Sequence, residues 1–324
     1  MDPSRRGIWI LNVAILIALA VVRPRFFDSG NLESVLAQMS IVGIGAAGMT
    51  VLIAAGAFDL SVTGIMGLAP VAALTIAPHA YGLVVILLAV VCGALAGCVN
   101  GLVITRGNVT PFVATLGTLF IFSSVAAIIS AGNTIAVEST LVTNIGAGSI
   151  GSVIPYSLLI MVGAFALCYV ILRRLHFGRW VRASGSNLLA AHVSGINVRG
   201  VYLRIFILSG ALTGLAGILL SGLLFSANAA QAPNYNLNTI AVVVIGGTSL
   251  MGGEATLVGT ALGAWLFAVV SDALTLLGTN SYWQYVATGA VLILALALNL
   301  VRFGSPVAFA RQWTRPAGAP GEPA

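Results

Sequence analysis

The polar side chains that could do chemistry in this chain are few, and most of them stand inside long apolar stretches. Asp59 and Ser61 lie between two apolar runs that leave no room for a loop, and Thr248 and Ser249 follow a short apolar run. Hydroxyl, amide and carboxylate groups in such surroundings suit brief hydrogen bonds to a passing polar solute. The candidate residues of a substrate pathway are Asp59, Ser61, Asn100, Thr115, Thr248, Ser249 and Asp272.

The same inventory argues against an active site. The chain has no Gly-x-x-x-x-Gly-Lys-Ser/Thr stretch and therefore no nucleotide cradle of its own. Cys92, Cys98 and Cys168 lie in apolar stretches without paired spacing, which is typical of small core residues. No His/Cys cluster and no nucleophile beside a base is recognisable. We expect no catalytic residue, no metal and no cofactor bound by this chain.

Asp59 has two interpretations. A carboxylate at mid-membrane costs at least ~2.5 kcal/mol on insertion scales, so it normally faces a bundle interior or water, as a pathway or hinge residue would. Alternatively, Asp59 caps a helix that opens at Leu60, with help from Ser61. Glu254 is better explained as a cap after Gly253 than as a site. Asp272 either touches solute or reaches the membrane interface.

Composition indicates which elements must position these residues. Hydrophobic residues make up 59% of the chain and charged residues 7%, with a mean hydropathy of +1.07. A soluble domain carries about 25% charged residues. The apolar runs are continuous rather than alternating, which excludes a membrane-spanning barrel. The fold class is therefore all-α, a polytopic transmembrane helical bundle.

The apolar runs predict about ten membrane spans, within a range of eight to ten. They form one transmembrane domain over residues 1–310, and the Pro/Gly-rich tail 311–324 is expected to be disordered. The first run has no cleavage pattern after it and is interpreted as a retained helix. The predicted spans are 8–22, 36–57, 60–77, 83–104, 111–130, 155–175, 203–226, 239–251, 255–276 and 285–301.

Two segments do not fit a simple span, one near residues 54–61 and one near 245–254. The second follows a run of only about twelve residues, which as a helix rises ~18 Å and falls short of a ~30 Å hydrocarbon core. Both segments therefore predict broken or re-entrant helices, which survive at membrane depth only in protein or beside a wet cavity. The glycines expected to permit these breaks are Gly56, Gly246, Gly247, Gly252 and Gly253.

Residues 173–200, the arginine-rich segment, stand out against the apolar background. The positive-inside tendency places this segment in the cytoplasm, and it explains the net charge of +6 without nucleic acid. Counting spans outward puts Arg106 and both termini inside and the 131–154 loop outside. Arg23 and Arg25 then fall outside, against the tendency.

The arginine-rich segment also has two interpretations. It is either a solvated basic loop that only sets orientation, or it docks a partner. For docking, the pattern predicts a short amphipathic helix from about Asn187 to Val193, capped by Ser186 or Asn187 and stopped by Gly195. Its apolar surface would come from Leu188, Leu189, Ala190 and Ala191.

Four blocks of sequence resemble a known family, the permease subunits of bacterial ATP-binding-cassette sugar importers of the ribose/xylose/arabinose/galactose branch. They run from Gly48 to Val62, from Val99 to Thr118, from Phe177 to Val198 and from Ile240 to Gly253. The chain departs from the family pattern at Ala57-Phe58, Leu188-Leu189, Asn236, Asn238 and Asp272-Ala273.

The resemblance implies a permease in the bacterial inner membrane that carries a monosaccharide or related polyol. It implies a second permease copy or paralogue, a binding protein that is periplasmic or lipid-anchored, surrounding lipid, and a separate cytoplasmic ATPase that holds ATP and Mg. The residues expected in the ATPase-coupling loop are Gly178, Arg179, Arg182, Gly185, Asn187, Ala190, Ala191, Ser194, Gly195 and Asn197. The alternative is a gradient-driven transporter or channel without an ATPase, with Asp59 and Asp272 as ion-coupling residues.

Overall fold

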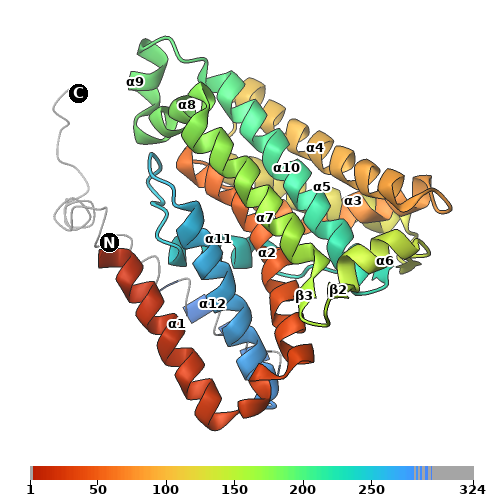
Figure 1. Cartoon of the computed structure of the whole chain (residues 1–324). Helices are drawn as coiled ribbons and strands as arrows, with labels where there is room; N and C mark the ends of the chain where they lie inside the picture. Colours follow the sequence, from red (N-terminus) through yellow and green to blue (C-terminus); the bar gives the residue numbers. More distant parts are fainter. Residues whose placement is uncertain (1–2, 281, 284, 287–288, 291–292, 294–324) are drawn as a thin grey trace.

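The computed structural model describes residues 3–280, 282–283, 285–286, 289–290 and 293. Over these residues the chain is a bundle of helices with four two-residue strands (Figure 1). Its elements are α1 (Pro3–Val22), η1 (Pro24–Phe27), α2 (Ser29–Ala54), α3 (Val62–Ile76), α4 (Gly82–Gly107), α5 (Pro111–Ile129), β1 (Ile135–Ala136), α6 (Thr140–Ala147), β2 (Ser149–Ile150), β3 (Ile154–Pro155), α7 (Tyr156–Tyr169), η2 (Val170–Arg174), α8 (His176–Ser186), α9 (Leu188–Val193), α10 (Val198–Leu223), β4 (Ser226–Ala227), α11 (Tyr235–Ile245) and α12 (Leu257–Leu276).

Six helices in the described part of the chain are long and apolar enough to cross a membrane: α2, α4, α5, α7 with η2, α10 and α12. They coincide with six predicted spans. Three shorter apolar helices, Asn12–Val22, α3 and α11, correspond to three more. The tenth predicted span, 285–301, and the tail 311–324 lie mostly or wholly outside the described residues. The membrane-helix bundle is therefore confirmed, whereas the count of ten stays a prediction.

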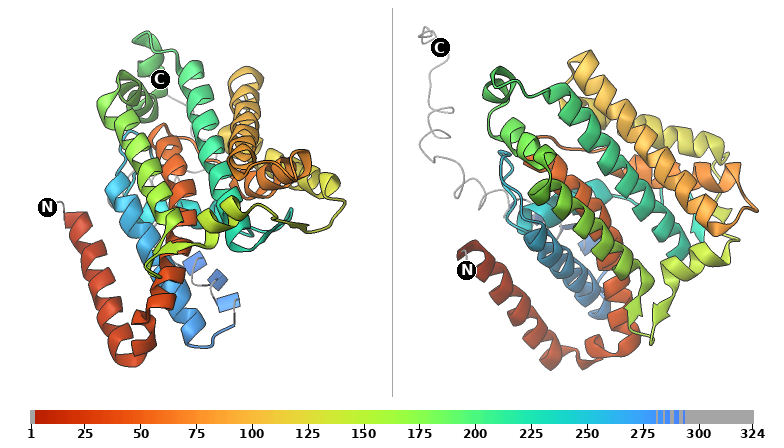
Figure 2. Two further views of the ribbon diagram at one scale, coloured as in Figure 1. Left: turned by 45° about the vertical axis from the view of Figure 1, so that its right-hand side comes forward. Right: turned by 45° about the horizontal axis from the view of Figure 1, so that its top comes forward.

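Helix α2 is the centre of the bundle. It is buried continuously from Ser40 to Ala54, because its residues there are apolar or small on every face. It packs against α7, α10, α11 and α12. Helix α1 stands apart from the rest (Figure 2) and is held mainly by a small apolar cluster of Leu19, Phe26, Val35, Ala268 and Val269.

Glycines allow α4 and α10 to pack with their backbones almost in contact. A side chain at Gly93 or Gly97 would collide with the backbone of α10, and one at Gly210 or Gly214 would collide with the backbone of α4. Close approach through small residues is the usual way to join membrane helices, because lipid supplies no hydrophobic drive between them. This pair is the most extensive helix contact in the bundle and fixes the position of α4 beside α3.

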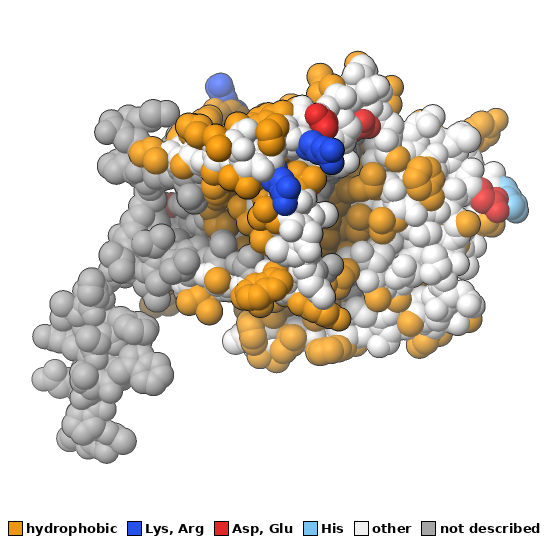
Figure 3. Space-filling model, turned by 90° about the horizontal axis from the view of Figure 1, so that it is seen from below, with side chains coloured by type: hydrophobic (Ala, Val, Ile, Leu, Met, Phe, Trp, Pro, Cys, Tyr) orange, Lys and Arg blue, Asp and Glu red, His pale blue; other side chains and the backbone are white. Residues whose placement is uncertain are grey.

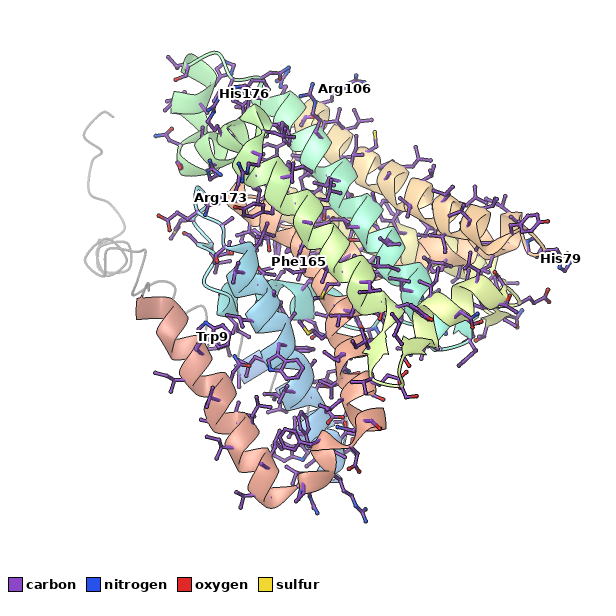
Figure 4. The ribbon with its side chains drawn as sticks, in the orientation of Figure 1. Trp9, His79, Arg106, Phe165, Arg173 and His176 are labelled. Atoms are coloured by element: carbon purple, nitrogen blue, oxygen red, sulfur yellow. The ribbon has the colours of Figure 1, made fainter. Side chains whose placement is uncertain are left out.

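The bundle has two distinct ends. Arg106, Arg173 and His176 lie toward the end that carries α8 and α9, and His79 lies at the other (Figure 4). At the second end, β1 pairs with β4 and β2 pairs with β3, and His79 contacts Glu138 at 3.1 Å. Seen from below, the molecule shows scattered apolar patches among uncharged polar side chains and backbone, with few charged side chains (Figure 3). Arg106 and the arginine-rich segment therefore share an end, opposite the 131–154 loop, as predicted.

Candidate functional site

The first broken segment lies between α2 and α3, where the chain leaves the helix after Ala54 and resumes it at Val62. Gly56 turns the chain with φ of 76°, a conformation that favours glycine. Asp59 and Ser61 follow, and both are fully buried. The Ser61 N–H donates to Asp59 Oδ1 at 2.8 Å, and the Ser61 hydroxyl donates to the same oxygen at 2.6 Å. Asp59 thus closes a turn just before α3. The N-cap of α3 is Ser61 and the helix begins at Val62, so the capping interpretation, with Asp59 as the cap of a helix opening at Leu60, is wrong. The pathway role of Asp59 stays a prediction.

A chain of hydrogen bonds extends from Ser61 into α4 and α5. Asn100 Nδ2 donates to Ser61 Oγ at 2.7 Å, and Thr118 Oγ1 donates to Asn100 Oδ1 at 2.6 Å. The Leu60 N–H donates to Thr115 Oγ1 at 3.0 Å. These side chains are buried. Thr115 Oγ1 also donates to the Pro111 carbonyl at 2.8 Å, and Asp59 Oδ2 has no hydrogen-bond partner among the described residues. We call Asp59, Ser61, Asn100, Thr115 and Thr118 the buried polar network; it joins the start of α3 to two neighbouring helices.

Four of those five residues were predicted, and Thr118 was not. The missed signal was its spacing, since Thr118 follows Thr115 by one helical turn and shares its face of α5. Pro111 begins α5, as expected for a proline at a first helical position. Asn100 lies inside α4, which continues to Gly107.

The second broken segment joins α11 to α12. Gly246 ends α11, and Gly247, Gly252 and Gly253 have φ between 80° and 82°. Thr248 and Ser249 are buried between these glycines, where the Thr256 N–H donates to Thr248 Oγ1 at 3.3 Å. Thr256 caps α12 by accepting from the Gly259 N–H at 3.1 Å. Glu254 is exposed, so the prediction of Glu254 as the cap is wrong: the shorter Thr256 side chain stands at the position that reaches the free N–H groups.

The two broken segments meet each other. The Gly253 N–H donates to the Ala54 carbonyl at 2.9 Å, which gives the end of α2 a donor partner from the second segment. Nearby, the Tyr202 hydroxyl of α10 donates to the Ala55 carbonyl at 2.9 Å, and Thr50 and Thr260 share a buried hydrogen bond at 2.9 Å. Segments far apart in the sequence therefore form one structural unit.

The arginine-rich segment contacts that unit through Gly185 at the end of α8. A side chain at Gly185 would collide with the Ala54 carbonyl and with the Gly253 N–H. A side chain at Gly252 would collide with the backbone of Gly185 in turn. We call Ala54, Gly185, Gly252 and Gly253 the glycine junction. It is the point where α8 touches both broken segments.

Two helices, α8 and α9, lie wholly within the arginine-rich segment, where the sequence predicted one. The predicted helix is α9, and Asn187 caps it by accepting from the Ala190 N–H at 2.9 Å. Gly195 ends it with φ of 82°, where the Ile196 N–H donates to the Ala191 carbonyl at 3.1 Å. Asn197 then caps α10 through the Gly200 N–H. Helix α8 was not predicted, because its arginines and glycines interrupt the apolar periodicity that would indicate a helix.

Some residues of the arginine-rich segment pack against the rest of the protein, and others are exposed. Arg182 donates to the Leu172 carbonyl at 2.5 Å, and Arg204 of α10 lies over the Phe177 ring at 5.9 Å. A side chain at Gly178 would collide with the turn at Leu172. Arg179, Ala190 and Ser194 are exposed.

The outer surface of α9 is apolar. Leu188 is 53% exposed, Leu189 73% and Val193 78%, whereas Ala191 is buried against the bundle. Of the four residues predicted to form the apolar surface, Leu188, Leu189 and Ala190 are therefore exposed, and the prediction is wrong for Ala191.

Asp272 lies apart from the buried polar network. It accepts a hydrogen bond of 2.8 Å from Asn31 Nδ2, which joins the last turns of α12 to the first turn of α2. Asn31 also donates to the Phe26 carbonyl at 3.1 Å. Across the described residues, no group of three or more His, Cys, Asp or Glu side chains could hold a metal ion. The structure thus does not bring Asp59 and Asp272 together.

Comparisons with known proteins agree with this architecture. Residues 31–296 match the family described as branched-chain amino acid transport system / permease component. The ribose import permease protein RbsC of Bacillus subtilis (strain 168) is 37% identical over 298 residues, which cover 90% of each chain. RbsC of Escherichia coli (strain K12) is 34% identical over 302 residues, covering 90% of this chain and 94% of that one.

The galactose/methyl galactoside import permease protein MglC of Escherichia coli (strain K12) is 33% identical over 317 residues, covering 92% of this chain and 94% of that one. The family match includes both broken segments and the whole arginine-rich segment. The predictions of a multi-pass membrane protein and of a transport subunit rather than an enzyme are confirmed. The chain belongs to the family of transport-system permease components.

Proposed function

We propose that this chain is the membrane-spanning subunit of an ATP-driven importer for a monosaccharide or a related neutral polyol. The relatives named above import ribose, galactose and methyl galactoside. Hydroxyl and amide groups dominate the polar side chains between the helices, and such groups suit a neutral polyhydroxylated solute.

The glycine junction is the observation that carries the mechanism. Helix α8 touches the backbones of both broken segments at Gly185, so a displacement of α8 must shift Ala54 and Gly253 as well. Close-packed backbones transmit displacement, because no soft side chain lies between them. A cytoplasmic ATPase that grips the exposed leucines of α9 would thereby rearrange the breaks at 54–61 and 246–253.

The proposed topology and partners are those predicted from the sequence. The α8–α9 end and both termini are assigned to the cytoplasm. A solute-binding protein delivers the solute at the opposite end, near the 131–154 loop and residues 227–238. A second permease copy or paralogue completes the pathway in the bacterial inner membrane. ATP and Mg are held by the ATPase and not by this chain.

Reconstitution tests this proposal directly. The permease is purified with the ATPase and binding protein encoded beside it and placed in liposomes. We expect uptake of radiolabelled ribose or galactose that requires all three proteins and ATP. Uptake by the permease alone, driven by an imposed proton or sodium gradient, would contradict the proposal and support a secondary transporter.

A further inference from the structure

Helices α3 and α11 are both too short to cross a membrane, and they begin side by side. The chain that leads into α11 runs along α3: a side chain at Gly67 would collide with the Ala229 backbone, and Gln231 Nε2 donates to the Met66 carbonyl at 2.7 Å. At the start of the two helices, Thr63 Oγ1 donates to Asn236 Oδ1 at 3.2 Å, and the Asn236 N–H donates to Thr63 Oγ1 at 3.2 Å.

This pair lies well inside the bundle. Thr63 follows Ser61, which is bonded to Asn100, and Asn100 is bonded to Thr118. Asn100 stands seven positions before the end of α4, and Thr118 seven positions after the start of α5. Seven residues rise roughly 10 Å along a helix. Both counts therefore place the Thr63–Asn236 pair deeper than about 10 Å from the α8–α9 end.

Hydrogen-bonding capacity remains unused at this depth. Both Thr63 and Asn236 are only partly buried, unlike the buried polar network. Among the described residues, no group accepts from Asn236 Nδ2, which carries two N–H donors. An amide that faces lipid without a partner costs several kcal/mol, so polar side chains at this depth normally face water or protein.

We infer that the Thr63–Asn236 pair is a solute-contact site on the translocation path and that it selects for a neutral polyol. This inference rests on the proposed function. It assigns the solute contact to this pair and not to the buried polar network. The side chains of the buried polar network are enclosed between helices and cannot reach a solute unless α3, α4 and α5 separate. The Asn236 amide offers two free donors, and the Thr63 hydroxyl, which donates to Asn236 Oδ1, holds that amide in one orientation.

Thiol labelling tests the site without reference to any solute. Cys92, Cys98 and Cys168 are first replaced by alanine, and Asn236→Cys is then treated in liposomes with a small, water-soluble, charged methanethiosulfonate. Two matched controls are Ser40→Cys, which is fully buried in α2, and Phe120→Cys, which is 66% exposed on the apolar surface of α5. We expect Asn236→Cys to react at least tenfold faster than either control.

Thr63→Cys provides a second reporter if Asn236→Cys does not fold, and we expect the same excess over the controls. If the variant that folds, Asn236→Cys or Thr63→Cys, is labelled no faster than the two controls, the inference is overturned. Transport in the reconstituted complex supplies an independent readout: Asn236→Leu should lower ATP-dependent uptake at least tenfold, and Asn236→Gln should change the ratio of ribose to galactose uptake. Uptake and ratio within twofold of the unsubstituted complex would also overturn it. Failure of the unsubstituted complex to take up sugar would instead count against the proposed function alone.

Discussion

The side chain of Gln231 supplies the hydrogen bond that Pro70 removes from α3. Pro70 lies inside the helix and has no N–H, so the carbonyl of Met66, four residues earlier, loses its helical donor. Gln231 Nε2 donates to that carbonyl at 2.7 Å, and Gln231 Oε1 accepts from Ser221 Oγ at 3.1 Å. A proline in a membrane helix is thus stabilised by an amide from a distant segment of the chain.

Gln231→Leu should lower stability by about 1–3 kcal/mol, because it leaves a buried carbonyl without a donor. In a Pro70→Ala background the loss should be smaller, since an alanine restores the N–H that the helix lacks. Thermal midpoints are measured in detergent for the unsubstituted protein, the two single variants and the double variant. This double-mutant cycle gives the coupling energy between Gln231 and Pro70. Equal losses in both backgrounds would show that Gln231 does not compensate for Pro70.

Asn100→Leu should destabilise the chain by about 1–3 kcal/mol, because Ser61 and Thr118 would each lose a buried partner. Thr118→Val should have a smaller effect alone, because it breaks only the bond from Thr118 to Asn100. It should add little to Asn100→Leu, which breaks that same bond. Leu95→Ala is the control on α4, because Leu95 is 62% exposed. Thermal midpoints in detergent are compared for all of these variants. Fully additive effects of the two network substitutions would argue against a shared network.

Gly185→Ala should abolish ATP-dependent uptake, because its methyl group would collide with Ala54 and Gly253. Gly163→Ala in α7 is the matched control: no atom lies within 4 Å of its added methyl group. Alanine should favour that helix by up to about 1 kcal/mol. Uptake in reconstituted liposomes and ATPase binding are measured for both. Normal uptake by Gly185→Ala would remove the glycine junction from the mechanism.

Leu189→Glu should reduce co-purification of the ATPase at least tenfold, because it places a charge on the exposed apolar surface of α9. Leu141→Glu is the control, since Leu141 is 41% exposed on α6 at the opposite end of the bundle. The control should leave the ATPase bound. Loss of ATPase from both variants would indicate a general folding defect, and loss from neither would exclude α9 as the docking surface.

The amino-acid sequence by itself determined where most of the helices lie along the chain. Continuous apolar runs predict membrane helices wherever they are long enough, so the sequence located α2, α4, α5, α7, α10 and α12. The starts were least accurate for α2, predicted at 36 and found at Ser29, and for α10, predicted at 203 and found at Val198. Local rules also located both breaks and the Pro111 start of α5, and they narrowed the cap of α9 to Ser186 or Asn187, because glycine, proline and asparagine act on their nearest neighbours.

Only the tertiary structure decided which of these local features meet. Nothing in the sequence pairs Gly253 with Ala54, Gln231 with Met66 or Thr63 with Asn236, because each bond joins segments far apart along the chain. Such contacts depend on which helices become neighbours, and close packing of small residues between α4 and α10 sets part of that choice. Buried polar groups then pair with whatever the packing brings within reach, which is why Asp59 and Asp272 occupy separate environments.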